Sequence, residues 1–491
     1  MGGSRSSYSS TLFTSLLLLL LLPPAAAASV LSLSNNSLPT LLHSNSREAI
    51  EIGIGIGIGG GGSPPPESEP ICPPPPPPPP CPPPPLPPPP PPPPKPVGPG
   101  PSDFENILLY RAYFVIQRFR KTITDDPKGI SKSWRGYDIC HKHTQDTYKG
   151  FFCGIPPTRK TMRNVASIDF NGYNLGAETL QGFIDRMPDL AIFHANSNNF
   201  SGTVPDLSKL RFLYELDFSN NKLTGSFPIN VLPLLANISF LDLRFNQFFG
   251  TVPPSVFGIK LDVLFINNNN FTQALPDDLG STNASYLTLA NNGFTGPIPA
   301  SIGKACNTLM EVLLLNNSLS GCLPYQVGLL KKATVFDAGT NQITGPIPLS
   351  FGCLLKVEQL NLARNLLYGK VPDVVCRLAD YGHLANLSLS SNYFTRLGFS
   401  CWELIDRGIL DVRHNCIPGL PDQRSPEECA WFLKQPKYCP VLPYIPCYIP
   451  WMHGGGVPSA TAMLPAVNGG WDTSPASRYP SYSALLNVHG P

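Results

Sequence analysis

The sequence has few charged residues and almost no excess of either sign. Asp, Glu, Lys and Arg make up 14% of the 491 residues, and the formal net charge is +2. Proteins that bind nucleic acid through its phosphates carry a basic excess, so nucleic-acid binding is not expected. Long apolar runs are also scarce, because none after the N-terminal region approaches the roughly 20 apolar residues of a spanning helix. We therefore expect no membrane span in the mature chain.

Patterns of catalytic residues are missing as well. The sequence holds no Ser/His/Asp arrangement and no glycine-rich phosphate loop. We therefore expect no enzymatic activity and no cofactor. Cys140 and His143 stand close together, but no second group of ligands lies nearby in the sequence, so no metal site is predicted.

The N-terminal region indicates secretion. Arg5 precedes an unbroken apolar run at 16–22 and small residues at 25–28, which is the pattern of a signal peptide, assigned here to residues 1–28. Thirteen cysteines fit an oxidising compartment. Asn-x-Ser/Thr sequons agree with secretion, and beyond Asn35 the expected glycosylation sites are Asn199, Asn237, Asn270, Asn283, Asn316 and Asn386.

Residues 29–101 are predicted to be disordered, with a Gly/Ile segment followed by a proline block. The block Pro73 to Pro94 is interrupted only by Cys81 and Leu86. Such a run favours a polyproline II rod, about 70 Å long at roughly 3.1 Å per residue. We interpret it as a stiff spacer, with a wall-embedding segment or a docking site for a proline-binding partner as alternatives. Residues 448–491 are also expected to be disordered.

One asparagine recurs along two thirds of the chain. Each copy follows an apolar pair at positions −5 and −3 and usually precedes an apolar residue at +2, as around Asn221. The apolar pair has the alternation of a short strand, and the asparagine amide can bond backbone groups of neighbouring turns. Intervals of 23 to 27 residues mark a solenoid, in which a turn buries its apolar face only against its neighbours. The ten copies are Asn198, Asn221, Asn246, Asn269, Asn292, Asn317, Asn341, Asn365, Asn392 and Asn415.

The pattern predicts an α/β repeat solenoid, a leucine-rich repeat horseshoe of about 10 to 11 turns. Residues 165–400 hold the repeats, and a degenerate copy starts at Ile168 with Tyr173 in the asparagine position. A Gly-x-Ile/Val-Pro continuation, as at Gly296-Pro-Ile298-Pro299, resembles the plant extracellular class of these repeats.

An N-terminal cap is predicted at residues 102–164, because the first turn would otherwise expose its core. Ser102-Asp-Phe-Glu105 has the form of a capping box, and apolar spacing to Phe119 indicates a helix with one buried face. We expect Cys140 to be bridged to Cys153.

The final repeat and a cysteine-rich C-terminal cap are assigned to residues 401–447. Cys376 can meet either Cys401 or Cys353, and Cys306 and Cys322 add further options. The odd total leaves a thiol free or intermolecular, with Cys72 and Cys81 as candidates, so a disulfide-linked dimer stays open. Four cysteines are expected to staple the cap, with three connectivities open: Cys416, Cys429, Cys439 and Cys447.

Motifs near both ends resemble those of the plant leucine-rich repeat extensin family. Asn415-Cys416-Ile-Pro-Gly-Leu-Pro421, Gln423-Arg424-Ser425 and Glu428-Cys429-Ala430 are similar to its cysteine-rich hinge, and Ser320-Gly321-Cys322-Leu323-Pro324 also matches. The resemblance covers roughly residues 102–447 and is nearest to members without the long C-terminal extensin region. It implies an extracellular, wall-associated protein whose repeats bind peptides of the rapid alkalinization factor type.

The concave sheet is the expected binding face, through the outward positions −6, −4, −2 and −1. Acidic residues prevail there, so a small basic secreted peptide would be steered to it. Exposed aromatic residues on adjacent turns suggest interface anchors, although Asp at −4 is also a generic letter of this repeat. The predicted ligand-binding residues are Glu215, Asp217, Phe240, Asp242, Arg244, Phe245, Phe265, Tyr286, Glu311 and Asp337.

A wall polysaccharide is the other ligand class that fits a secreted binding protein of the cell wall or apoplast. Two further functions stay open. The chain could inhibit microbial wall hydrolases, as polygalacturonase-inhibiting proteins do, or it could be a structural wall component linked through its proline rod and cysteines.

Overall fold

A computed structural model describes residues 98–141, 147–159, 161–229 and 238–440 of the chain. All of them belong to one compact unit, Pro92–Pro491. The predictions for the signal peptide, the proline block, Asn35, Asn237, Cys447 and the tail fall on residues outside these ranges.

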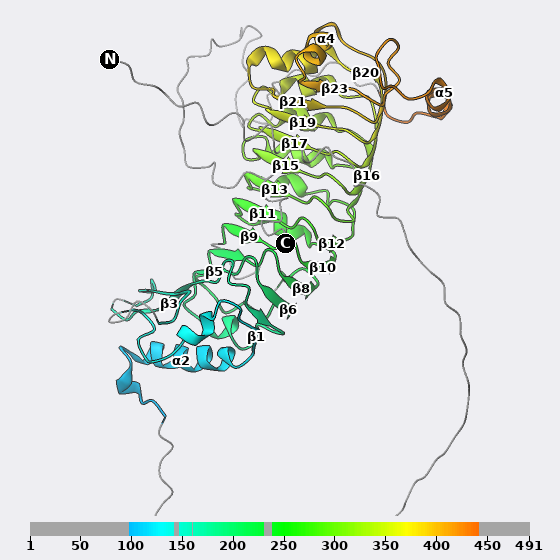
Figure 1. Ribbon diagram of the computed structural model, residues 1–491. Coiled ribbons are helices and arrows are strands. Elements are labelled where there is room, and N and C mark those ends of the chain that lie inside the picture. The colour runs from blue at the N-terminus through cyan, green and yellow to red at the C-terminus, as the bar shows by residue number, and fades with distance from the viewer. Residues whose placement is uncertain (1–97, 142–146, 160, 230–237, 441–491) are drawn as a thin grey trace, which may run out of the picture. The chain divides into compact units, whose positions relative to one another are not determined.

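The repeats form one long sheet that runs the length of the described unit (Figure 1). Its strands are parallel throughout, apart from the first pair, which is antiparallel. We call it the long sheet; its twelve strands, in spatial order, are β2 (Phe151–Gly154), β3 (Asn164–Asp169), β5 (Ile192–His194), β7 (Glu215–Asp217), β9 (Phe240–Asp242), β11 (Val263–Phe265), β13 (Tyr286–Thr288), β15 (Glu311–Leu313), β17 (Val335–Asp337), β19 (Gln359–Asn361), β21 (Asn386–Ser388) and β23 (Leu410–Asp411).

The strands that come directly after the ladder asparagines in the sequence belong to two shorter sheets. The first side sheet contains β1 (Ile123–Asp125), β4 (Gly176–Ala177), β6 (Asn199–Thr203), β8 (Lys222–Gly225), β10 (Gln247–Gly250) and β12 (Asn270–Phe271). The second side sheet contains β14 (Thr295–Gly296), β16 (Ser318–Cys322), β18 (Gln342–Gly345), β20 (Leu366–Lys370) and β22 (Tyr393–Arg396).

Short helices complete the turns and caps. The 3-10 segments are η1 (Pro101–Asp103), η2 (Ile130–Ser133), η3 (Ile184–Arg186), η5 (Pro254–Gly258), η6 (Leu279–Ser281), η7 (Ala300–Ala305), η8 (Tyr325–Leu329), η9 (Leu349–Cys353) and η10 (Arg377–Tyr381). The α-helices are α2 (Ile107–Arg120), α3 (Asp373–Cys376), α4 (Phe399–Asp406) and α5 (Pro426–Lys434).

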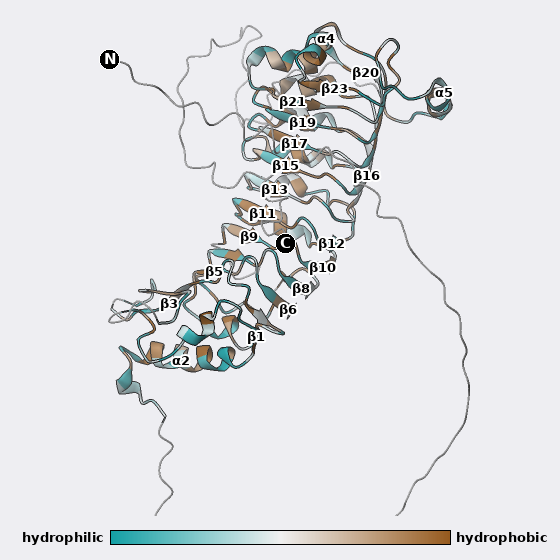
Figure 2. Cartoon of the chain, in the orientation of Figure 1, coloured by the Kyte–Doolittle hydropathy of each residue, from teal (hydrophilic) through white to brown (hydrophobic). Residues whose placement is uncertain are grey.

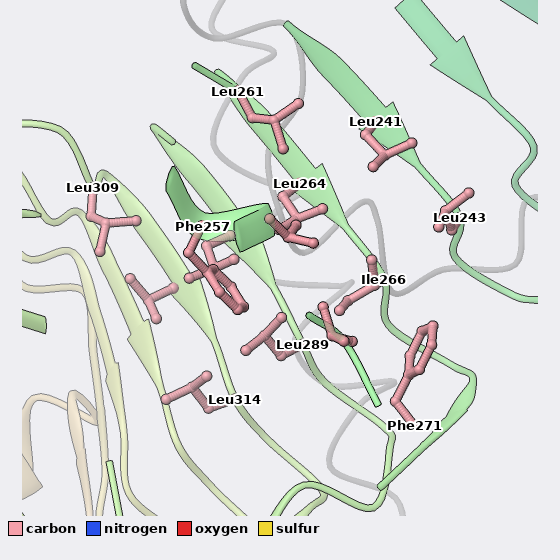
Figure 3. Close-up of a cluster of buried hydrophobic side chains, with 14 of the residues drawn as sticks. Leu241, Leu243, Phe257, Leu261, Leu264, Ile266, Phe271, Leu289, Leu309 and Leu314 are labelled. Carbon is pink, nitrogen blue, oxygen red and sulfur yellow. The ribbon is translucent and has the colours of Figure 1, made fainter. Parts of the chain in front are cut away.

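The core lies between the long sheet and these outer segments. Leu241, Leu264 and Leu287 occupy the −5 position of successive turns, pair in register and are fully buried. Figure 3 shows the first two beside Phe257 and Phe271, which reach the same core from an outer helix and a side-sheet strand. Eleven parallel strands, β3 to β23, confirm the predicted solenoid of about 10 to 11 leucine-rich turns.

The recurring asparagine ties each turn to the previous one. The Asn246 Nδ2 donates to the carbonyl oxygens of Leu243 and Arg244 in its own turn and of Phe218 in the turn before. Its Oδ1 accepts the N–H of Leu223, also in the turn before. All ten asparagines make this set of contacts. The ladder therefore satisfies buried backbone groups that no strand pairs.

The N-terminal helix begins later than the capping box predicted. Ser102 lies in η1, and α2 begins at Ile107, because the Asn106 Oδ1 accepts the N–H groups of Leu108 and Leu109. An asparagine in this position satisfies helix donors that otherwise lack a partner. The helix buries one face against the first turns, with Ile116 fully inaccessible.

Four disulfides join described residues: Cys140–Cys153, Cys376–Cys401, Cys416–Cys429 and Cys322–Cys439. The last one corrects the expectation that Cys439 bonds within the C-terminal cap. The segment after α5 crosses back over the second side sheet and reaches Cys322, 117 residues earlier. Cys353 is also disulfide-bonded, and Cys306 is a buried free thiol.

The residues of the hinge motif hold the C-terminal cap together. Ser425 and Glu428 form a capping box at the start of α5. The Arg424 Nε donates to the Asn392 carbonyl oxygen at 2.8 Å, and its guanidinium carbon lies 4.3 Å from the centre of the Tyr393 ring. These contacts assign the motif a structural role.

Candidate functional site

The outward positions of the long sheet form two continuous rows across the predicted binding residues. In the −6 row, strand register places Glu215, Phe240, Val263, Tyr286 and Glu311 side by side. In the −4 row it places Asp217, Asp242, Phe265, Thr288, Leu313 and Asp337 side by side. Apart from Arg244 and Phe245, which follow β9, the predicted residues therefore come together on β7 to β17.

The aspartates at the −4 position have a structural role, whether or not a ligand binds them. One carboxylate oxygen accepts the backbone N–H two residues later, from Asp217 to Ser219, from Asp242 to Arg244 and from Asp337 to Gly339. Asp411 does the same with Arg413. One oxygen of each −4 aspartate therefore has the structural role expected of a residue that is common to this class of repeat. Only the second oxygen is left for other partners.

The rows are less exposed than an open sheet would make them. Asp242 and Asp337 expose 0% and 1% of their surface, and Phe265 and Tyr286 expose 1% and 6%. The expectation that these four side chains are exposed is therefore wrong. Asp337 is engaged locally, since it accepts the Asn361 Nδ2 at 3.0 Å.

The aromatic residues instead form a compact apolar cluster. Val263, Phe265 and Tyr286 are buried together, with Phe240 packed against them. The Phe240 and Phe265 rings meet edge to face at 6.4 Å, and the Arg244 guanidinium carbon lies 5.4 Å from the centre of the Phe265 ring. β11 is apolar at all three positions, which Figure 2 shows in brown. This cluster supplies a desolvated floor for the acidic residues beside it.

A second apolar cluster was missed from the sequence. Ala290, Leu313 and Val335 are buried on adjacent turns, with Leu315 packed against them. Their positions in the repeat are a signal for them, because Leu313 and Val335 stand at the outward −4 and −6 positions, where apolar side chains of adjacent turns meet.

Two carboxylates stand next to each other at the N-terminal end of this floor. Asp217 and Asp242 pair in register on β7 and β9. Burial raises the pKa of Asp217 and raises that of Asp242 well above its ordinary value, with the Asp217 charge adding to the second shift. The Arg244 Nε lies 3.1 Å from the Asp242 Oδ2, so the two attract as an ion pair without the alignment of a hydrogen bond.

A half-buried histidine extends the charged group. The His194 Nε2 lies 2.9 Å from the Glu215 Oε2, and their side chains are 24% and 28% exposed. Glu215 therefore presents its charge at the edge of the Asp217–Asp242 pair, where solvent and a ligand can reach it. His194 is not among the ligand-binding residues predicted from the sequence.

The residue before each ladder asparagine adopts a left-handed backbone, with φ between 51° and 59° at all ten positions. Four of these residues are asparagines, which tolerate this conformation. Phe245 does not, because a bulky side chain at positive φ is strained. Because all ten turns share this conformation, it is a property of the repeat and does not by itself mark Phe245 as functional.

Buried polar atoms without hydrogen-bond partners gather on the same turns. Within the described ranges they include both amide atoms of Asn220, the Asp242 Oδ2, the Arg244 Nε and the Thr288 Oγ1. Buried polar atoms are usually paired, so a concentration on adjacent turns needs an explanation. The Arg244–Asp242 ion pair provides one for two of these atoms.

The expected glycosylation sites lie on different faces. Asn270, Asn283 and Asn316 are exposed, and Asn199 is half-buried in β6. Asn386 lies in β21, on the long sheet itself, and accepts a hydrogen bond from the Ser388 Oγ at 2.9 Å. A glycan on Asn386 would leave the turns of β7 to β15 as the free part of the face.

Across the described ranges no group of His, Cys, Asp and Glu side chains is arranged to hold a metal ion. In the same part of the chain, no helix combines the length and apolar character that a membrane span requires.

A leucine-rich repeat family model matches residues 212–234. Leucine-rich repeat extensin-like protein 7 of Arabidopsis thaliana is 37% identical over 336 residues, which cover 68% of this chain and 75% of that protein. Leucine-rich repeat extensin-like protein 2 of the same plant is 41% identical over 240 residues, covering 49% of this chain and 30% of that protein. The alignments with the first three relatives span 30%, 49% and 38% of their lengths.

A solved structure described as a plant ice-binding protein has a TM-score of 0.51 with 21% identity, covering 64% of this chain and 97% of that one. A likeness at this identity shows the solenoid fold alone.

Proposed function

Because the chain belongs to the leucine-rich repeat extensin-like family, we propose that it is a secreted, wall-associated protein whose long sheet binds a small basic peptide. The site would extend over the turns of β7 to β15. We propose the rapid alkalinization factor type as the ligand, as the family resemblance implies.

The observation that carries the proposal is the half-buried Glu215 at the edge of the buried Asp217–Asp242 pair. A lysine, an arginine or an N-terminal amine of a peptide would supply donors to Glu215, beside the buried Asp217–Asp242 pair. Such a cation would also favour the ionised carboxylates that burial disfavours. The apolar floor around Phe265 and the strained Phe245 would supply contact area for the rest of the peptide.

The test is a calorimetric titration of the full secreted chain with a panel of basic peptides of this type. We expect saturable binding that Glu215→Lys weakens at least about tenfold, since one charge reversal in a partly desolvated site costs more than about 1.4 kcal/mol. Glu215 is preferred to Asp242, because a lysine in place of a fully buried residue could disrupt the fold.

Gln359→Lys is the matched control. Gln359 stands at the same −6 position on β19, beyond the proposed site, so this variant should retain its affinity. Absence of binding across the panel would reject the peptide ligand. Pectin fragments and microbial polygalacturonases would then test the polysaccharide and inhibitor alternatives.

A further inference from the structure

A second concave region lies away from the long sheet, where the C-terminal segment crosses the second side sheet. It encloses about 750 Å³ and is lined by residues from three consecutive turns together with Cys439 and Pro440. We call it the outer groove. A cavity of this volume falls in the range of ligand sites.

Repetition of the sequence builds the floor of the outer groove. Pro324, Pro348 and Pro372 end the Gly-x-x-Pro segments of the three turns, and each is followed directly by the first residue of a short helix. These following residues are Tyr325, Leu349 and Asp373, spaced 24 residues apart. The floor is therefore a ladder of prolines with one variable side chain per turn, and it runs along the stacking direction.

The other wall is held by covalent and aromatic contacts. The Cys322–Cys439 disulfide fixes the crossing segment to β16. Phe432 of α5 stacks on Tyr393 at 3.6 Å and lies 6.3 Å from Tyr368, which also lines the groove. Figure 1 shows α5 on the side of the unit where β16 and β20 lie. The crossing segment is thus held by the disulfide to β16, and α5 is held by ring contacts to β20 and β22.

The lining combines apolar rings with hydrogen-bond donors. Tyr325 and Tyr368 contribute aromatic rings, and Gln326 and Lys370 contribute amide and ammonium donors. The one carboxylate of the lining, Asp373, already accepts the Ser400 N–H at 2.7 Å. A complementary ligand is therefore apolar, rich in acceptors and poor in donors.

We propose that the outer groove binds a proline-rich polypeptide in the polyproline II conformation. Proline residues offer ring surfaces and carbonyl acceptors without N–H donors, and grooves lined by aromatic residues recognise such chains. The repeat lengths also agree. A polyproline II helix advances about 9.3 Å in its three-residue turn, and two steps of the solenoid advance about 9.6 Å. A proline chain along the groove would then present the same face to Tyr325 and to the Asp373 turn.

The test uses a fluorescein-labelled L-proline decamer and the secreted chain, with residues 73–94 replaced by a Gly/Ser linker so that the chain brings no proline block. Fluorescence anisotropy should give a Kd below about 1 mM. The mirror-image D-proline decamer has the same composition and the opposite helical hand. It should bind at least about tenfold more weakly, because its repeat length is the same but its handedness no longer fits the groove.

Tyr325→Ser should also weaken binding of the L-proline decamer at least about tenfold, whereas Tyr381→Ser, at a half-exposed tyrosine outside the groove, should not. Equal binding of both decamers, or unchanged affinity in Tyr325→Ser, would overturn the proposal. Binding of oligogalacturonides without binding of the L-proline decamer would also overturn the proposal. Glu215→Lys should leave proline binding unchanged, so this proposal and the peptide proposal fail independently.

Discussion

Asp217 and Asp242 lie directly opposite each other on adjacent parallel strands, and burial raises the pKa of both carboxyl groups. One of the two, Asp242, has no exposed surface, and its Oδ2 has no hydrogen-bond partner among the described residues. The protonation of this pair is therefore linked to the stability of the fold.

The first prediction concerns pH. A carboxyl group with a raised pKa binds protons more tightly in the folded chain, so its contribution to stability is greatest below the unfolded pKa of about 3.9 and falls as pH rises toward the raised value. Asp242→Asn removes this penalty. The melting temperature of Asp242→Asn, measured by calorimetry relative to that of the unaltered protein, should therefore increase as the pH rises from about 4 toward the raised pKa.

Asp411→Asn is a control of opposite sign. Although burial opposes the effect, hydrogen bonds from Arg413 lower the pKa of Asp411. Its ionised form stabilises the fold, and this contribution is fully present above the unfolded pKa of about 3.9 and is lost as pH falls below it. The variant should therefore be less stable than the unaltered protein by a constant amount above about pH 5, and the difference should shrink in more acidic solution. If Asp242→Asn changed the stability by the same amount at every pH, the raised pKa of Asp242 would be contradicted.

The second prediction separates stability from binding at Phe245. Left-handed backbone costs most residues roughly 1–2 kcal/mol, and asparagine much less. Phe245→Asn should therefore raise the free energy of unfolding by about 1 kcal/mol while it weakens peptide binding. Thr340→Asn, at the same position of a turn beyond the proposed site, should stabilise without changing affinity. Denaturant titration and calorimetry measure the two effects.

The third prediction concerns the disulfide Cys322–Cys439. It closes a separation of 117 residues, against 13 for Cys416–Cys429. Replacing Cys322 and Cys439 by serine should cost about 2–5 kcal/mol and open the C-terminal turns locally, because stability in a solenoid depends on nearest neighbours. Hydrogen exchange should show lost protection from β16 onward and unchanged protection near α2. Uniform loss along the chain would argue against local opening.

The fourth prediction compares two glycines with left-handed backbones. A Cβ on Gly345 would stand 2.7 Å from the Cys439 Cβ, whereas one on Gly369 would meet nothing within 4 Å. Both alanine variants pay for positive φ, but only Gly345→Ala displaces the crossing segment. It should cost about 1–3 kcal/mol more than Gly369→Ala and weaken proline binding in the outer groove. Equal costs would mean that the segment can move away freely.

The sequence by itself determined the solenoid, its number of turns and the role of the asparagines. Each turn repeats a short pattern that acts on its immediate neighbours, so one copy such as Leu216 to Leu223 contains the rule for all of them. The residues that face outward from the long sheet could also be predicted, because strand alternation decides which positions share a face.

Tertiary structure decided the features that depend on distant or competing partners. Cys439 bonds Cys322 because the crossing segment places them together, and cysteine spacing carries no such information. Asn106 caps α2 in place of Ser102, because both residue types can accept hydrogen bonds from helix N–H groups and only packing selects between them. Burial of Asp242 and Phe265 was likewise hidden, because exposure depends on side chains from adjacent turns, which lie more than 20 residues away in sequence.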